Sequence, residues 1–211
     1  MDHAPKRRPG RPRQALDEGA ILEVAWSAFL EHGLDGASMV AIARSAGVSR
    51  LTLYRRYPSK AALFDAAMQA HVQGLDLPRR LAGDAPLADV LVDYGVQLMT
   101  FLTSDQLIEL QARLMGQIRA RPDLARAFFE SGPGGARDDL ADLLRTRGPE
   151  AGLAIDDPLE AAEALMGLWI GLKVLKVEMG LDIEEVRASI PRHVRRMVAL
   201  ALRAWAAPSS S

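Results

Sequence analysis

The sequence predicts an all-α protein with a small N-terminal helix-turn-helix domain of three helices and a larger helical domain after it. Apolar residues recur at spacings of three and four in one segment after another, which is the pattern of amphipathic helices. Capping serines and aspartates, glycines and prolines fall between those segments. Within Ser38–Lys60, two short segments of this kind flank a glycine, which is typical of a helix-turn-helix.

The composition restricts the chemistry open to the chain. Its 211 residues include no cysteine, which excludes disulfides, thiolate metal sites and cysteine nucleophiles. The four histidines are widely scattered, and no H-E-x-x-H, G-x-S-x-G or Walker pattern occurs. We therefore expect no metal site, no cofactor and no enzymatic activity.

The sequence also bears on location. No apolar run reaches the roughly 18 residues that a membrane-spanning helix needs. The first residues, MDHAPKRRPGRPRQ, lack the apolar segment of a signal peptide. We expect a cytoplasmic protein with no membrane partner.

Charge is unevenly distributed along the chain. Residues 1–60 carry ten basic and six acidic side chains, a net charge of +4, whereas the whole chain has a net charge of −1 and the remainder therefore −5. A basic N-terminal quarter on an acidic body is typical of a domain that binds a polyanion. Ordinary scatter of surface charge is the alternative.

Residues 1–14 are rich in proline, glycine and arginine and are predicted to be a disordered basic arm. The arm contains a GRPR tetrapeptide with Arg11 and Arg13. Arginines in such hooks enter the narrow minor groove of DNA, where the negative potential is enhanced. The alternative is a solubilising tail that touches phosphates without preference.

Residues 15–62 are predicted to form the helix-turn-helix domain. A first helix is expected over about Asp17–His32, with Gly33 as its terminator. Trp26 and Phe29 lie on its apolar side and are interpreted as core aromatics. Ser38 is the predicted N-cap of a second helix that ends near Ala46.

The third helix is the candidate for the DNA major groove. Gly47 supplies the positive φ of the turn before it, Ser49 caps it and Pro58 ends it. Leu53 and Tyr57 lie four apart and are predicted to face inward. The outward or rim positions are basic, aromatic or hydroxyl-bearing for the most part: Arg50, Leu51, Thr52, Tyr54, Arg55 and Arg56. Arg55 and Arg56 could instead be a solvated pair.

This region closely resembles the DNA-binding domain of TetR/AcrR-family transcriptional regulators, over about residues 15–65. Many positions match at fixed spacing: Gly33, Gly36, Ser38, Met39, Ile42, Ala43, Ala46, Gly47, Val48, Ser49, Thr52, Leu53, Tyr54, Tyr57, Ser59 and Lys60. The resemblance implies binding to a palindromic operator in double-stranded DNA by a homodimer.

The resemblance also implies residue roles. Ser38, Tyr54 and Lys60 match phosphate contacts, and Lys60 begins a fourth helix that Ser59 caps. Arg50, Leu51 and Thr52 match the groove-facing start of the reading helix, where Arg50 could recognise guanine. Ser49 and Arg55 complete the predicted DNA-binding set. Two positions depart from the family: Leu51 stands where many members have glycine, and Val40 where some carry a polar base-reading residue.

Residues 63–211 are predicted to form a helical domain, which the resemblance makes the ligand-binding and dimerisation domain. The fourth helix links it to the first domain. The remaining pattern predicts a linker at Pro78–Pro86, helices from Leu87 and from Asp105, breaks at Arg121–Asp123 and Ser131–Gly135, a helical piece over Asp139–Arg147, a loop over Gly148–Pro158 and a long apolar helix over Leu159–Met179. Because Pro191 suits the start of a helix better than its middle, the final helix is expected to begin near Ile190, with Asp182–Ala188 as a separate piece.

The last two helices are apolar enough to suggest a four-helix dimer interface, to which Gly167 and Gly171 would allow close approach. A wholly intramolecular core is the alternative. An apolar effector cavity is predicted from Phe101, Met115, Phe128 and Trp169, although plain core packing would explain each of them.

We therefore expect a TetR-like DNA-binding regulator, a repressor that a small apolar or amphipathic molecule releases from its operator. An architectural DNA-binding dimer without an effector is the alternative.

Overall fold

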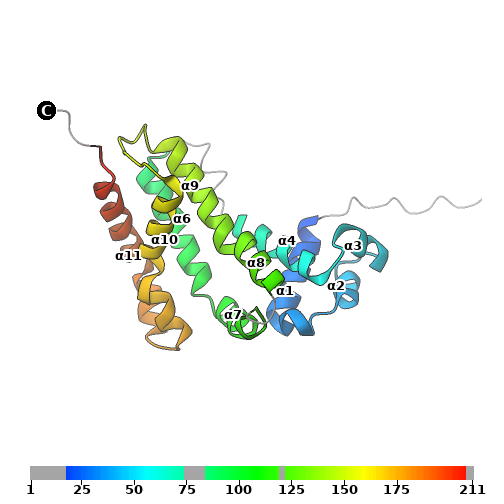
Figure 1. Ribbon diagram of the computed structural model, residues 1–211. Helices are drawn as coiled ribbons and strands as arrows, with labels where there is room; N and C mark the ends of the chain where they lie inside the picture. The colour runs from blue at the N-terminus through cyan, green and yellow to red at the C-terminus, as the bar shows by residue number, and fades with distance from the viewer. Residues whose placement is uncertain (1–17, 74–83, 119–121, 208–211) are drawn as a thin grey trace, which may run out of the picture.

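The structure is a computed structural model that describes residues 18–73, 84–118 and 122–207 (Figure 1). Over those residues it is helical apart from one isolated bridge between Leu153 and Ala206, which confirms the predicted all-α fold. The N-terminal domain, called the head below, contains α1 (Glu18–Gly36), α2 (Met39–Ser45) and α3 (Arg50–Arg56). Helix α4 (Lys60–Gln73) leads from the head to the rest of the chain, called the body below.

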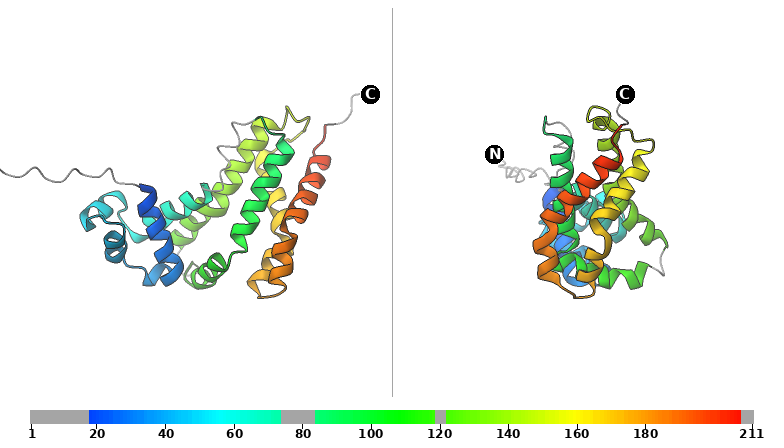
Figure 2. Two further views of the ribbon diagram at one scale, coloured as in Figure 1. Left: turned by 180° about the vertical axis from the view of Figure 1, so that it is seen from behind. Right: turned by 90° about the vertical axis from the view of Figure 1, so that its left-hand side faces the viewer.

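The described part of the body contains α6 (Leu87–Leu102), α7 (Asp105–Ile118), α8 (Pro122–Phe129), η1 (Glu130–Gly134), α9 (Gly135–Arg147), α10 (Pro158–Glu178) and α11 (Ile183–Ala204). Helices α10 and α11 lie side by side at the end of the molecule farthest from the head (Figure 2). None of the helices in the described ranges combines the length and apolar character of a membrane span.

Two hydrophobic clusters stabilise the molecule. The first fills the head and continues through α4 to α7, α8 and α9, and it includes Trp26 and Phe29 as the sequence predicts. The second lies in the body between α6, α9, α10 and α11. Phe101, Leu102 and Met166 pack against both clusters, so the two cores meet at these residues.

Local signals set the ends of the helices in the head. Gly33 has a φ of 67° and kinks α1 at the predicted terminator. Gly47 has a φ of 69° in the turn between α2 and α3. The Ser59 hydroxyl accepts a hydrogen bond from the Ala62 N–H at 3.1 Å and so caps α4. These predictions are confirmed.

The predicted break at Ser131–Gly135 is wrong. The chain continues from α8 to α9 through the π-helical turn η1, which contains Pro133. A π turn hydrogen-bonds one residue farther along than an α turn and accommodates a proline that lacks an N–H. Gly134 is needed because a Cβ there would lie 2.9 Å from the carbonyl oxygen of Phe129.

The predicted start of the last helix is also wrong. Helix α11 is continuous over Ile183–Ala204 with Pro191 inside it. Pro191 is exposed, so water can solvate the carbonyl that the missing N–H leaves free. Helix α7 begins at Asp105 as the sequence predicts, and Ser104 caps it, because the Ser104 hydroxyl accepts a hydrogen bond from the Leu107 N–H at 3.4 Å.

The loop predicted before the long apolar helix is confirmed. Asp157 caps α10, accepting hydrogen bonds from the Leu159 and Glu160 N–H groups at 2.8 and 3.2 Å. Helix α10 is distorted at Gly171, which has a φ of 39°. Most of the predicted linker Pro78–Pro86 lies outside the described residues, as does Arg121, and α8 begins at Pro122.

Candidate nucleic-acid interface

Helix α3 is fixed at its start by a hydroxyl cap. The Ser49 hydroxyl accepts a hydrogen bond from the Thr52 N–H at 3.0 Å and lies 2.7 Å from the Thr52 hydroxyl. Both side chains therefore define where the helix begins. Their hydroxyls also lie at the edge of the surface that α3 presents to solvent.

The register of α3 separates core residues from surface residues. Leu53 and Tyr57 are 1% and 6% exposed, which confirms their predicted inward orientation. With 100° between successive residues, Leu51 and Arg55 lie opposite Leu53, at the centre of the outward face. Leu51 is 71% exposed. An apolar side chain that is exposed to this extent adds no burial energy to the stability of the folded chain.

Two other predicted residues flank that face. Arg50 and Tyr54 lie beside Leu51 on the same helix and are exposed.

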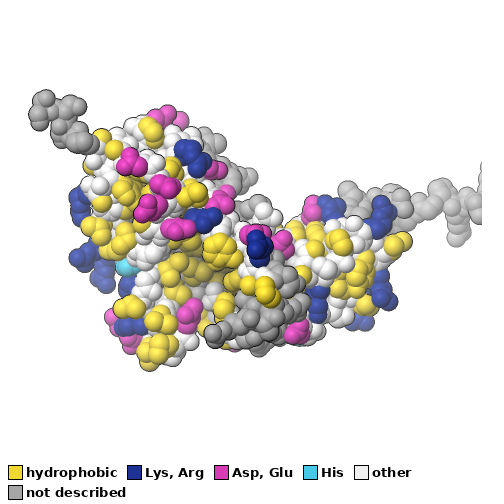
Figure 3. Space-filling model, in the orientation of Figure 1, with side chains coloured by type: hydrophobic (Ala, Val, Ile, Leu, Met, Phe, Trp, Pro, Cys, Tyr) yellow, Lys and Arg dark blue, Asp and Glu magenta, His cyan; other side chains and the backbone are white. Residues whose placement is uncertain are grey.

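Two residues of interest lie at α2. Ser38 is its N-cap, and the Ser38 hydroxyl accepts a hydrogen bond from the Ala41 N–H at 3.4 Å. Val40 is 44% exposed on α2. The structure therefore groups the predicted contacts on one end of the head, where Lys and Arg side chains are prominent in Figure 3.

Lys60, a predicted phosphate contact, is bound within the head. Its Nζ donates hydrogen bonds to the carbonyl oxygens of Asp35 and Ala37, each at 2.9 Å. Lys60 thus ties the first turn of α4 to the end of α1. An ammonium group has three donors, so one remains for a phosphate. Its contact with DNA stays a prediction.

Arg56 closes a polar cluster that sequence reasoning missed. Its Nε donates to Glu18 Oε1 at 2.9 Å, its Nη2 pairs with Glu18 Oε2, and the Tyr57 hydroxyl donates to Glu18 Oε1 at 3.1 Å. Hydrogen bonds from Arg56 and Tyr57 hold the pKa of Glu18 below its usual value. The cluster joins the end of α3 to the start of α1, and no local signal could reveal it because the partners lie 38 and 39 positions apart.

The predicted hook residues Arg11 and Arg13 lie outside the described residues. Over the part of the chain that the structure describes, no group of three or more histidine, cysteine, aspartate or glutamate side chains could hold a metal ion.

A small apolar cavity of about 70 Å³ lies where α4 meets the body. Two of the four predicted ligand residues, Phe101 and Phe128, line it. Its lining comes from α4, α6, α7, α8, η1, α9 and α10: Met68, Leu98, Phe101, Leu102, Leu107, Gln111, Phe128, Gly132, Pro133, Ala136, Met166 and Ile170.

The other two predicted ligand residues lie elsewhere. Met115 is 45% exposed on α7 and is not part of the cavity lining. Trp169 is fully buried in the second cluster, with its ring centroid 6.1 Å from that of Tyr94. A Cβ on Gly95 would lie 2.8 Å from the Trp169 ring, so a missing side chain on α6 makes the space for this indole. Trp169 therefore lies in the second hydrophobic cluster and outside the lining of the cavity.

Two family models match the chain. The model described as bacterial regulatory proteins, tetR family, matches residues 21–67. The model described as AefR-like transcriptional repressor, C-terminal domain, matches residues 89–207.

Curated relatives agree with those models. The chain is 34% identical over 90 residues to an uncharacterized HTH-type transcriptional regulator of Mycobacterium tuberculosis, covering 43% of this chain and 47% of that protein. It is 29% identical over 144 residues to the DNA-binding transcriptional repressor TetR of Mycobacteroides abscessus, covering 68% and 66%. The chain thus spans about half the length of the first of these relatives and about two thirds of the second.

A solved structure matches most of the chain. The protein described as Flavonoid-responsive Regulator FrrA is 31% identical, with a TM-score of 0.65 over 90% of this chain and 97% of that one.

A helix-turn-helix head on a helical body of this kind defines a DNA-binding transcriptional regulator. The C-terminal model alone covers more than half of the chain, and the chain belongs to the TetR family of bacterial regulatory proteins. Members of this family are transcriptional regulators rather than enzymes, which confirms the expectation that the chain is a regulator.

Proposed function

We propose that this TetR-family regulator is a dimeric repressor that a small, neutral, apolar or amphipathic molecule releases from a palindromic operator. The observation that carries the proposal is the position of α4. This helix begins at Lys60 against the end of α1, and its Met68 lines the cavity in the body. A molecule that changed the cavity would therefore act on a helix attached to the head.

The outward face of α3 supports sequence-specific reading. Leu51 and Arg55 occupy its centre, and Arg50 and Tyr54 its flank. An arginine can pair with guanine, and an apolar side chain can contact the methyl group of thymine. We infer that Leu51 reads a thymine methyl and that the arginines contact bases or phosphates beside it.

The exposed surface of α10 supports a dimer. Leu172, Leu175 and Met179 are spaced by three and four and are 75%, 47% and 65% exposed. Among the described residues, nothing outside the adjoining backbone of α10 lies within 4 Å of a Cβ placed on Gly167 or Gly171. A second copy would cover this apolar stripe and use the space at the glycines. Two heads held at a fixed distance would then meet half-sites about one helical turn apart.

The effector is inferred from the lining of the cavity and from one relative. The described lining is apolar apart from Gln111. The relative FrrA is described as flavonoid-responsive, and flavonoids are neutral aromatic molecules. The regulator would exist in two forms, one that binds DNA and one that does not. The ligand can shift the equilibrium between them and release the operator only if it binds the second form more tightly.

The test begins with genomic DNA fragments captured by the purified protein, followed by gel-shift titration of the enriched sequence. Arg55→Ala is expected to cost ~1–3 kcal/mol of operator binding, and Leu51→Ala is expected to relax preference at one A·T position. Arg145→Ala, an exposed arginine on α9, is the matched control and should bind as the native protein does. Equal affinity of Arg55→Ala and Arg145→Ala for the operator would contradict the assignment of this face.

Two further measurements address the dimer and the effector. Leu172→Glu combined with Leu175→Glu should convert the dimer to a monomer in light scattering and weaken operator binding. A library of neutral aromatic compounds should include at least one that releases the operator. If the native dimer binds DNA and no compound releases it, the architectural alternative is favoured.

A further inference from the structure

The apolar cavity is too small for the effector that the proposed function requires. Its volume is about 70 Å³. An engineered apolar cavity that binds benzene measures roughly 150 Å³, and sites for drug-sized ligands measure about 300–1,000 Å³. The ligand-binding form must therefore be larger than the form described here.

A larger groove lies on the other side of the cavity wall. It measures about 380 Å³ and runs between the head and the body, lined by Trp26 and Leu30 of α1, His71 of α4 and residues of α6 and α7. Part of its lining is aromatic, because the rings of Trp26 and His71 lie together with centroids 4.4 Å apart and planes tilted by 30°. Gln97 and Thr100 of α6 add polar groups.

Phe101 and Leu107 separate the two spaces, because both residues line the cavity and the groove. Phe101 is half-buried, and its ring centroid lies 6.4 Å from that of Trp26. Phe101 is the larger of the two, so rotation of its ring is the side-chain movement that would open most of the wall between the groove and the cavity. The joined space would fall within the usual range for a small-molecule site.

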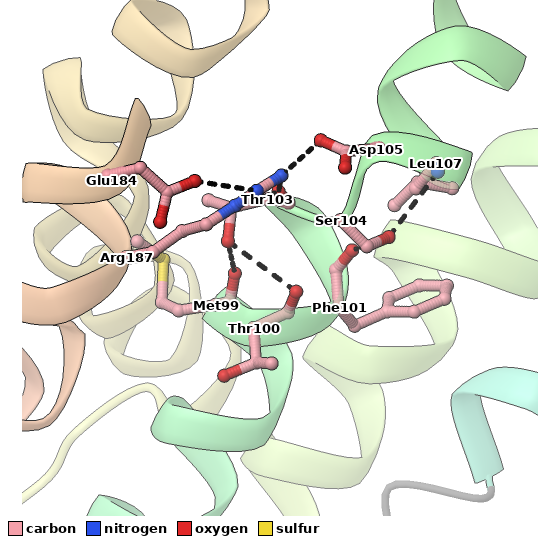
Figure 4. Close-up of polar contacts among 9 residues, drawn as sticks. All are labelled: Met99, Thr100, Phe101, Thr103, Ser104, Asp105, Leu107, Glu184 and Arg187. Atoms are coloured by element: carbon pink, nitrogen blue, oxygen red, sulfur yellow. Dashed lines mark hydrogen bonds and ion pairs between the residues drawn. The ribbon is translucent and has the colours of Figure 1, made fainter. Parts of the chain in front are cut away.

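The backbone beside Phe101 is held in place. Arg187 of α11 donates from Nε and Nη2 to the carbonyl oxygen of Thr103, at 3.1 and 2.7 Å, and pairs with Asp105. Figure 4 shows Phe101 and Leu107 on the side of this corner opposite Arg187. A fixed backbone leaves side-chain rotation as the movement that opens the wall.

Gln111 and the absence of charge define what would bind. The Oε1 atom of Gln111 is buried and has no hydrogen-bond partner among the described residues. A buried acceptor without a partner is costly, and a ligand that donates a hydrogen bond removes the cost. Of the described residues around both spaces, His71 alone is titratable, and burial lowers its pKa so that it is neutral at pH 7.

We propose that the cavity and the groove are one binding site divided by Phe101, and that it takes a neutral aromatic molecule whose hydroxyl group donates a hydrogen bond to Gln111. The aromatic body of the ligand displaces the Phe101 ring and extends into the groove against Trp26. The inference rests on the proposed function for its regulatory meaning, because the groove contacts the head through α1 and α4.

Calorimetric titration of the full-length protein tests the site with three probes of one size class: 4-phenylphenol, 4-fluorobiphenyl and biphenyl-4-carboxylate. The phenol should bind about tenfold more tightly than the fluoro compound, which lacks the donor. The carboxylate should bind most weakly, because none of the described residues that line the two spaces is a lysine or an arginine that could pair with it. Gln111→Leu should abolish the preference for the phenol, whereas Met115→Ala, on the exposed side of α7, should retain it.

A filled groove tests whether the two spaces form one site. Thr100 lines the groove but not the cavity, and its hydroxyl donates to the Val96 carbonyl oxygen at 2.8 Å. Thr146 of α9 is also exposed, and its hydroxyl donates to the Asp142 carbonyl oxygen at 2.7 Å. Thr100→Trp should weaken phenol binding at least about tenfold by occupying the groove, and Thr146→Trp should leave it unchanged.

Equal binding of the phenol by Thr100→Trp and Thr146→Trp would overturn the joined site. An unchanged preference for the phenol in Gln111→Leu would overturn the role of Gln111, and no binding of any probe to the native protein would overturn the whole proposal. Operator binding is measured separately in gel shifts. If the protein binds DNA but none of the probes, only this inference is contradicted. If it binds the phenol but no DNA, only the proposed function is contradicted.

Discussion

The head and the body use the same structural element to different ends. In the head, function is proposed for side chains that point outward from α3, and the buried residues Leu53 and Tyr57 hold that helix against the core. In the body, function is inferred for a space enclosed by helices that are distant in the chain, such as α4 and α10. A surface can be read from one helix and its register, whereas a cavity depends on how several helices pack.

The two regions also differ in how polar contacts stabilise them. The head uses short-range hydroxyl caps at Ser38, Ser49 and Ser59. The body fixes its α6–α7 corner through Arg187, a residue 84 positions away from Thr103. Caps can be recognised in a sequence, but a contact of that range cannot.

The largest expected effect is a loss of stability on removal of Trp169, the fully buried aromatic residue in the core of the body. Trp169→Ala should lower the free energy of unfolding by ~3–5 kcal/mol, because it leaves a cavity among fully buried neighbours. Chemical denaturation followed by circular dichroism measures this loss.

The same variant separates the two cores. Trp169 belongs to the body cluster and not to the head cluster. Operator affinity should therefore be retained at temperatures where the variant is folded. A large loss of affinity in a folded Trp169→Ala protein would show that the head depends on the body core more closely than the packing indicates.

The sequence predicts the head well because its constraints are local. The caps, the turn glycine and the inward pair Leu53 and Tyr57 all follow from spacing within one short stretch. The sequence does not predict what Lys60 and Arg56 contact, because their partners lie on α1 and just after it. Both residues carry a positive charge, and sequence alone cannot distinguish a charge used for DNA from one used within the fold.

The body is less predictable for a related reason. Aromatic and methionine side chains of similar composition divide between cavity wall, core and surface according to packing. Phe101 and Phe128 line the cavity, Trp169 fills the core and Met115 is exposed. Glycine and proline are misleading at η1 and in α11, because tertiary packing and solvent exposure outweigh their helix-breaking tendency there.

The π turn is the next most sensitive feature of the body. Gly134→Ala should destabilise the body by ~1–3 kcal/mol, because the new Cβ would lie 2.9 Å from the Phe129 carbonyl oxygen. Gly132→Ala is the control, since its Cβ would lie 3.8 Å from the nearest Met68 atom, which is ordinary contact. Helix propensity alone favours alanine at both positions. Equal thermal stability of the two variants would mean that the turn relaxes without cost.

A cap in the head supplies a smaller effect. Ser49→Ala removes the acceptor for the Thr52 N–H and should cost ~1 kcal/mol of stability. It should also weaken operator binding, because it frays the start of the reading helix. Ser49→Asp restores an acceptor and should recover stability while its negative charge opposes phosphate. A Ser49→Asp protein that binds the operator as tightly as the native one would place this residue away from the DNA backbone.

The smallest effect is expected from the exposed cluster that joins α1 to α3. In the folded protein, hydrogen bonds from Arg56 and Tyr57 hold the pKa of Glu18 below its ordinary value of 4.5. A carboxyl group with a depressed folded pKa adds stability above its unfolded pKa, and that stability is lost as the pH falls through the folded pKa. Glu18→Gln should therefore lower the melting temperature slightly at pH 7, and the difference from the native protein should vanish on acidification below pH 4.5.

Glu150→Gln, at an exposed loop position, is the control, and its difference from the native protein should not change with acidification in this way. High salt should shrink the difference at pH 7, because both charged partners are largely exposed. A difference between Glu18→Gln and the native protein that persisted unchanged in acid would mean that the shape of the side chain, and not its charge, holds the end of α3 to α1.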